Sequence, residues 1–237
     1  MSRIRLARFV LLIPAVAVAC ATLAGTAQAQ SRRRPASDGD STRAMRELER
    51  GVLEELNRAR EHPRAFAAML DTIAGWYEGK LLRRPGAGIV FETAEGAPAV
   101  KEASRVLRRM SPLPAFEPAD GLAHAARDHV REQGPRGRMG HKGSDGSSTA
   151  DRVERYGKWK FVLSENIAYG PLDARGMVVG LIVDDGVPDR GHRLNIFDAR
   201  VRVAGVSCGM HREYGRMCVI VHAGGFADTG QRADGAR

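Results

Sequence analysis

The 237-residue sequence contains few cysteines and few aromatic residues: three cysteines, with Phe, Trp and Tyr together at 5%. It has no H-E-x-x-H segment, no C-x-x-C pair and no EF-hand loop, which excludes the common local motifs for zinc, thiol redox chemistry and calcium. The net charge is +9, but the positive residues are mostly interleaved with acids and few aromatic side chains could stack on bases. We therefore expect no nucleic-acid partner.

The N-terminal region has the pattern of an export signal. Arginines precede a long apolar run, and Ala27-Gln28-Ala29 matches a small-x-small cleavage site, so residues 1–29 are predicted to be a signal peptide. The expected location is secreted or periplasmic. Lipidation at Cys20 is the alternative, and a membrane partner is expected only in that case. The polar residues 30–41 are predicted to be a disordered linker.

Cys208 and Cys218 remain after cleavage of the signal peptide. They flank a turn signal at residues 211–215 between two β-like runs, so they can face each other across a hairpin. Because export leads to an oxidising compartment, we expect a disulfide that stabilises the fold by roughly 2–3 kcal/mol. The alternative is a pair of buried free thiols.

The order of periodic segments predicts an α+β fold, with helices packed on a compact antiparallel sheet. Residues 42–227 form the predicted domain and residues 228–237 a flexible tail. Predicted helices start near Thr42 and after Pro63, and a third runs from Asp120, as its cap, to Gly134-Pro135. The remaining expected elements are helices at 99–110 and 173–183, a long loop at 80–98 with a possible extended piece at 89–91, an extended segment at 161–168, and the cysteine hairpin.

The stretch 140–197 holds the candidate functional side chains: His141, Glu165, Asp184 and His192. Imidazoles and carboxylates bind divalent metals and transfer protons. Their spacing matches no local metal motif, so a common site is a hypothesis about tertiary structure. The alternative is that they are solvated loop histidines and a capping acid.

Glycines precede both histidines of this stretch. Gly140 and Gly191 would allow tight backbone turns beside His141 and His192. His211 at the hairpin tip and His222 in the last strand are predicted to be structural.

Three segments carry a family resemblance. The sequence at GHKG, SENIAYG and DDGVPDRGHRLNIF resembles the CAP superfamily of cysteine-rich secretory proteins, antigen 5 and pathogenesis-related proteins, whose domain is also called SCP. The last of these segments has the form of a bacterial subfamily, and the resemblance runs from about Leu48 to Phe226. It implies an α-β-α sandwich with a central cleft in a secreted protein.

The resemblance also implies a cleft tetrad of two histidines and two acids. These positions correspond to His141, His192 and Glu165, with Asp184 where many relatives have glutamate and Asp185 as a near alternative. The implied cofactor is a divalent metal, with Zn²⁺ first, held by the histidines. The acids would complete the shell directly or through water.

The expected function is binding without catalysis, with an unknown small molecule, lipid or protein as the ligand. One alternative is a metal-assisted hydrolase of peptide or cell-wall bonds, in which Glu165 would be the catalytic residue. Another is a surface interaction module that uses the loops 80–98 or 136–150 and not the cleft.

Overall fold

The computed structural model describes residues 38–86, 90–170 and 172–229. The predicted signal peptide, Cys20, most of the linker and the end of the predicted tail lie outside the described residues. No helix within the described part of the chain is long and apolar enough to cross a membrane.

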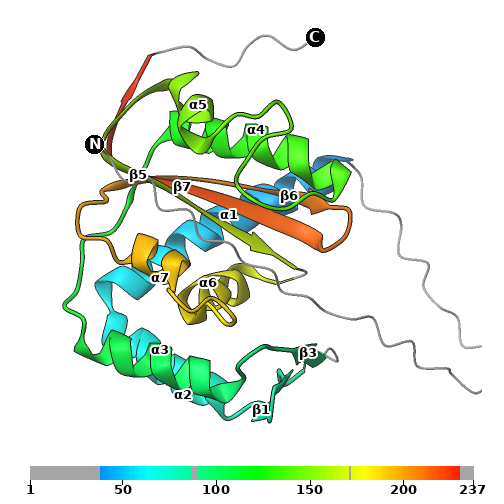
Figure 1. The fold of residues 1–237 in the computed structure, drawn as a ribbon, viewed down its shortest axis with the longest axis vertical. Coiled ribbons are helices and arrows are strands. Elements are labelled where there is room, and N and C mark those ends of the chain that lie inside the picture. The colour runs from blue at the N-terminus through cyan, green and yellow to red at the C-terminus, as the bar shows by residue number, and fades with distance from the viewer. Residues whose placement is uncertain (1–37, 87–89, 171, 230–237) are drawn as a thin grey trace, which may run out of the picture.

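The central sheet has four strands in the order β4-β6-β7-β5. Strands β6 and β7 form the predicted hairpin, β5 pairs antiparallel with β7, and β4 runs parallel to β6. Strand β5 therefore lies at one edge of the sheet (Figure 1). The bounds are β4 Glu117–Pro118, β5 Gly157–Tyr169, β6 Val203–His211 and β7 Gly215–Asp228.

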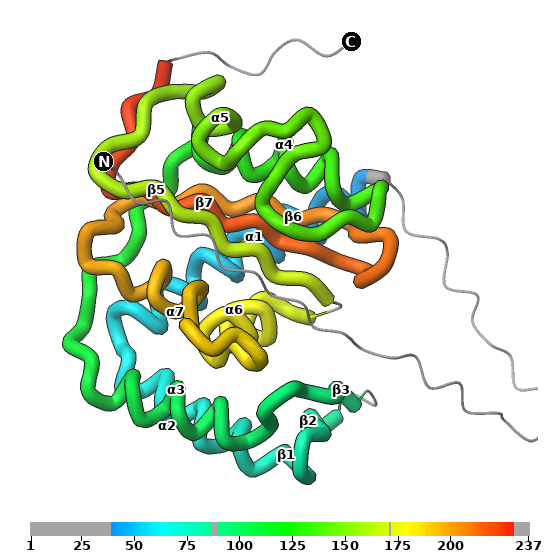
Figure 2. Tube along the Cα trace, viewed as in Figure 1, coloured from blue at the N-terminus to red at the C-terminus, as the bar shows by residue number. Residues whose placement is uncertain are grey.

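Helices cover both faces of this sheet. Helices α4 and α5 lie on one face, whereas α1, α6 and α7 lie on the other (Figure 1). Figure 2 shows α6 and α7 between the sheet and the paired helices α2 and α3. The bounds are α1 Asp38–Glu61, α2 Pro63–Ala74, α3 Ala97–Arg109, α4 Asp120–Arg136, α5 Thr149–Glu154, α6 Ala174–Val183 and α7 Gly191–Ile196. The predicted α+β sandwich is confirmed.

The core consists of two apolar clusters, one on each face of the sheet. Successive residues of a strand point to opposite faces, so in β7 Val219 packs toward α4 while its neighbour Ile220 packs toward the helices of the other face. In β5, Leu163 and Ile167 belong to the α4 cluster. By the same alternation, Glu165 faces α4 and α5, and Asn166 faces α6 and α7.

Two short strands of a small antiparallel sheet lie within the segment predicted as a long loop at 80–98. One of them, Val90–Glu92, overlaps the extended piece predicted at 89–91. The strands of this sheet are β1 Tyr77–Glu78, β2 Leu81–Arg83 and β3 Val90–Glu92, in that order. The prediction gave too much weight to the glycines and prolines of this segment. The apolar residues Leu82 and Phe91 pair across the sheet, and tertiary packing overrides the weak local signal.

Two helix ends differ from the predictions. Helix α1 begins at Asp38, before Thr42, so its first turn takes up the end of the predicted linker. Helix α4 has Asp120 as a first-turn residue and not as the cap, and it continues through Pro135 to a left-handed Gly137. A tertiary contact explains this last turn. The Gly134 carbonyl accepts from Arg212 N in the hairpin, and a side chain at Gly134 would collide with the Met210 carbonyl.

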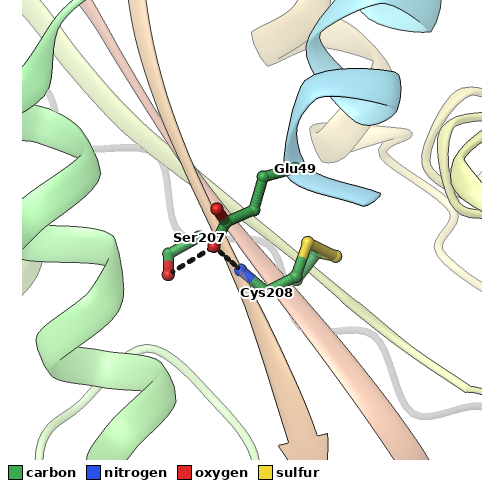
Figure 3. Close-up of a disulfide and its surroundings, with 4 residues drawn as sticks. Glu49, Ser207 and Cys208 are labelled. Carbon is green, nitrogen blue, oxygen red and sulfur yellow. Dashed lines mark hydrogen bonds between the residues drawn. A yellow bond between two sulfur atoms is a disulfide. The ribbon is translucent and has the colours of Figure 1, made fainter. Parts of the chain in front are cut away.

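The hairpin contains the predicted disulfide between Cys208 and Cys218, which face each other across β6 and β7. Beyond the short β4, Glu49 of α1 covers the outer edge of β6: its Oε1 accepts from Cys208 N at 2.9 Å and from the Ser207 hydroxyl at 3.1 Å (Figure 3). The disulfide joins β6 to β7, and the Glu49 carboxylate joins α1 to β6.

Candidate functional site

His141 forms the first half of the candidate site with two residues from other elements. Its Nδ1 lies 2.9 Å from Glu165 Oε1 on β5, and Arg152 of α5 donates to Glu165 Oε2 at 2.7 Å. The same guanidinium donates to the His141 carbonyl at 3.2 Å. Arg152 is only 2% exposed, so this ion pair is buried and both acid oxygens have defined partners. The sequence analysis did not identify Arg152.

The loop that carries His141 is held at Gly140. The Gly140 carbonyl accepts from His129 Nε2 at 2.9 Å and from Gln133 Nε2 at 2.5 Å, both on α4. Its N–H donates to the Tyr169 hydroxyl at 3.1 Å. Gly140 has φ 103°, a left-handed value that favours glycine, so the predicted tight turn beside His141 is confirmed.

Burial and charge act in opposite directions on Glu165. Burial alone would raise the pKa of this carboxyl, but the hydrogen bond from His141 and the charge of Arg152 outweigh it and lower the pKa below its usual value. Glu165 is therefore ionised at neutral pH, and its two oxygens accept hydrogen bonds from His141 and Arg152.

His192 forms the second half of the candidate site with a residue close in sequence. Its Nδ1 lies 2.7 Å from Asp184 Oδ1, and its backbone N–H donates to Asp184 Oδ2 at 2.9 Å. Both side chains are buried, His192 at 1% and Asp184 at 0% exposed. Neither histidine is a solvated loop residue, and neither acid serves only as a cap.

Asp184 and Asp185 have different roles. Asp185 accepts from the backbone N–H groups of Ala94 and Glu95 and so holds the segment between β3 and α3. Asp185 therefore pairs with this segment and not with His192. The acid that pairs with His192 is Asp184.

The turn before His192 differs from the prediction. Gly191 is the first residue of α7, and the left-handed conformation falls on Arg190, with φ 51°. The Arg190 side chain donates to the Asp184 carbonyl at 2.7 Å and forms an ion pair with Glu95. A side-chain contact, and not glycine, therefore stabilises this turn.

Strand β5 links the two halves. Asn166 follows Glu165 directly, and its Nδ2 donates to the His192 carbonyl at 3.0 Å. Its Oδ1 accepts from Asn195 Nδ2 at 2.8 Å. The acid of the first half and the amide that positions the second half are thus consecutive residues on one edge strand. Asn195 thus braces the segment that carries His192.

The family model described as the cysteine-rich secretory protein family, CAP, matches residues 103–222. The chain belongs to the CAP family. Similar solved structures include an extracellular protein containing an SCP domain from Bacillus anthracis str. Ames, at 18% identity and a TM-score of 0.39, with 54% of this chain and 37% of that one covered. An outer surface protein from Borrelia burgdorferi is similar at 15% identity and a TM-score of 0.40, with 47% and 78% covered. The chain thus spans just over a third of the length of the first. No curated protein matches it.

The CAP domain departs from the expected glutamate at Asp184, and the backbone offers a reason. Asp184 ends α6 in a left-handed conformation with φ 57°. Aspartate and asparagine adopt this conformation more readily than most residues with longer side chains. The short carboxylate at this position also reaches both the ring and the backbone of His192.

Two histidine–carboxylate pairs are the features of the CAP site that bear on metal binding. Each histidine has its Nδ1 against a carboxylate, a geometry that orients an imidazole for coordination through Nε2 and raises its basicity. Among the described residues, no group of three or more His, Cys, Asp and Glu side chains is placed to hold a metal ion. The geometry therefore suits Glu165 and Asp184 as partners of histidine ligands, in contrast to the expected shell in which they bind the metal.

A cavity of about 240 Å³ lies beside the second half of the site. Its walls are mainly apolar and come from α2, the small sheet and α6, and His192 and Asp184 stand in its polar part. The wall side chains include Met69, Ile73, Trp76, Leu82, Phe91 and Leu181. Two of these belong to the small sheet that the sequence analysis predicted as a loop.

His222 on β7 is also buried, and it forms no ion pair with the acids that the structure describes. Within the described residues, neither of its ring nitrogens has a hydrogen-bond partner. The same holds for the hydroxyl of Ser164, the residue of β5 that pairs with His222. Burial, together with the charge of Arg60, lowers the pKa of His222 to about 3. The ring packs against Phe116 and stays neutral. A structural role for His222 agrees with this environment.

Proposed function

We propose that this CAP domain is a non-enzymatic binding protein that takes a small apolar or amphipathic ligand into the cavity beside His192. The cavity, with its apolar walls and volume of about 240 Å³, is the observation that supports the proposal. A dry apolar cavity of about 150 Å³ accepts benzene, and pockets for drug-sized ligands start near 300 Å³. The expected ligand is therefore a short acyl chain or one or two rings.

The proposed location is outside the cytoplasm. The signal-peptide pattern of residues 1–29 and the Cys208–Cys218 disulfide support it, because disulfides persist in oxidising compartments. The small sheet provides part of the cavity wall through Leu82 and Phe91. This arrangement favours a ligand site over a surface module that does not use the cleft.

Calorimetric titration with octanoate and octanol tests the ligand proposal. Ala168 lies in the cavity wall on β5, and Ala168→Leu replaces its methyl group with a larger side chain that takes up cavity volume. This variant should weaken binding of both probes at least tenfold. Ala227→Leu, at the exposed end of β7, is the matched control and should bind like the wild type. If neither probe binds the wild-type protein, or if Ala168→Leu binds equally well, the cavity is not the ligand site.

We also propose that His141 and His192 hold a divalent cation, with Zn²⁺ as the first candidate. The carboxylates behind their Nδ1 atoms support this, since such partners raise the affinity of imidazole ligands. When bound, the metal would supply a Lewis-acid centre in the polar part of the cavity, where an anionic head group could bind. The apolar wall would accept the remainder of the same ligand.

Titration of Zn²⁺ into the mature, tag-free protein tests the metal site. The double variant His141→Ala/His192→Ala should lose binding, whereas His124→Ala, a histidine of α4 that packs against Tyr156, should retain it. Equal binding by the double variant would contradict the proposal. Octanol binding in the absence of added metal separates this outcome from failure of the cavity proposal.

Hydrolysis is the less favoured alternative. Its candidate base, Glu165, pairs with Arg152 and has a lowered pKa, and both properties weaken a general base. Turnover of casein or peptidoglycan by the purified protein, lost on Glu165→Gln, would favour the hydrolase over the binding function.

A further inference from the structure

Phe161 has an unusual combination of exposure and backbone conformation. Its side chain is 82% exposed, and its φ of 66° lies in the left-handed region. The left-handed conformation costs conformational energy for residues other than glycine, asparagine and aspartate. A buried ring could offset this cost through packing, but Phe161 buries little of its surface within the chain.

The strand geometry explains where this strain arises. Lys160 pairs with Gly225 and Leu163 with Ala223, so Phe161 and Val162 together lie opposite the single residue Gly224. This is a β-bulge, and glycine is the usual first residue when that position is left-handed. The chain has phenylalanine there, and its ring is exposed to solvent on the edge strand of the sheet.

Positive charge surrounds the exposed ring. Lys158 and Lys160 precede Phe161 on β5 and are exposed. Phe161 and the loop that carries Arg200 both lie close to Gly224. A Cβ placed on Gly224 would be 3.0 Å from Phe161 Cβ and 3.1 Å from the Arg200 carbonyl oxygen. Arg200 forms an ion pair with Asp198, and Glu154 of the nearby α5 accepts from Trp159. Lys158 and Lys160 form no ion pair with any residue that the structure describes.

We infer that Phe161, Lys158 and Lys160 form a docking site for an anionic lipid surface. A projecting aromatic ring can enter the boundary between head groups and acyl chains, and flanking lysines attract anionic head groups. Without residues 1–29, which contain three arginines and no acid, the net charge of +9 falls to 9 − 3 = +6, and this has the sign that such a surface attracts. A peptide strand is a poorer occupant, because a bulge disrupts the edge to which it would have to pair. This contact would be independent of any lipid at Cys20.

Co-sedimentation of the mature protein with phosphatidylglycerol/phosphatidylcholine vesicles tests this site, with pure phosphatidylcholine vesicles for comparison. Phe161→Gly should lower the partition coefficient about tenfold, which corresponds to loss of one buried aromatic ring. This variant should also have a higher denaturation midpoint, because glycine removes the left-handed strain, so weaker binding cannot result from misfolding. Phe161→Trp should retain binding.

Two further variants separate the contributions. Lys158→Gln/Lys160→Gln should weaken binding to the anionic vesicles by at least tenfold at low salt, and this difference should shrink as salt is added. Met210→Ala removes another exposed apolar side chain, 60% exposed on β6, and should bind like the wild type. The proposal fails if Phe161→Gly binds as well as the wild type, if Met210→Ala weakens binding equally, or if wild-type protein does not prefer the anionic vesicles.

Discussion

The two histidine sites of this CAP domain reach the same local chemistry by different routes. His192 obtains its acid from a residue eight positions earlier, across the short segment between α6 and α7. His141 obtains its acid from β5, 24 positions later, and needs Arg152 of α5 to compensate the buried charge. One pair is local, and the other depends on three elements that pack around the edge of a sheet.

This difference shows how each site is stabilised. The Asp184 carboxylate binds both the ring and the backbone of His192, so one side chain satisfies the local pair. Glu165 is shared between a histidine and an arginine. Removal of the arginine would leave a buried acid with insufficient compensation, and the first site should therefore be the more sensitive of the two.

The largest expected effect is on Arg152. Arg152→Met keeps most of the apolar stem but leaves Glu165 buried without its cation, which should lower the free energy of unfolding by about 3–5 kcal/mol. Arg155→Met is the matched control in the same segment. Its ion pairs are partly exposed, so a loss of about 0.2–1 kcal/mol is expected. Urea unfolding monitored by circular dichroism measures both, and similar losses would show that the Arg152 pair has no special importance.

His222 provides a comparison without an acid. Its folded-state pKa of about 3 lies below the unfolded value of 6.5, so below pH 6.5 the unfolded chain binds a proton that the folded chain does not. Stability is thus lost as the pH falls, by about 2 kcal/mol between pH 7 and pH 5 from this residue. In His222→Leu the dependence of unfolding free energy on pH should be flatter by that amount. Equal slopes in both proteins would contradict the prediction.

The smallest effect concerns the choice of aspartate at position 184. Asp184→Glu places a longer side chain in the left-handed conformation and misaligns both hydrogen bonds to His192, so a loss of about 1–2 kcal/mol is expected. Asp184→Asn suits the backbone but has one acceptor oxygen for two N–H donors, so it measures the loss of one hydrogen bond without the backbone effect. Thermal denaturation ranks the two variants. If Asp184→Glu were the more stable, the backbone explanation for the departure from the family pattern would be wrong.

Several features of the fold were predictable because they depend on local spacing. Pro63 marks the boundary between α1 and α2, and α6 covers Ala174–Val183 where a helix was predicted at 173–183. The cysteine hairpin followed from a turn signal between two β-like runs. Strands β1 and β2 were missed because they are short and acquire order from packing beside α2 and α6, whereas β3 overlaps the extended piece predicted at 89–91.

The candidate site was predictable in part. The resemblance identified His141, Glu165, Asp184 and His192, but it did not show that each acid pairs with one histidine. Arg152 gave no signal, since it lies in a short polar segment that is typical of a solvated helix. Its burial depends on the distance between α5 and β5, which no local pattern contains.

The sequence by itself determined the family, the order of helices and strands, and the residue types of the site, because short-range periodicity and motifs are properties of neighbouring residues. Only the tertiary structure decided which acid pairs with which histidine, that an apolar cavity lies beside His192, and that Phe161 projects from a strained bulge. Those features depend on how segments distant in sequence pack, and the cost of burying a charge or exposing a ring is set by that packing.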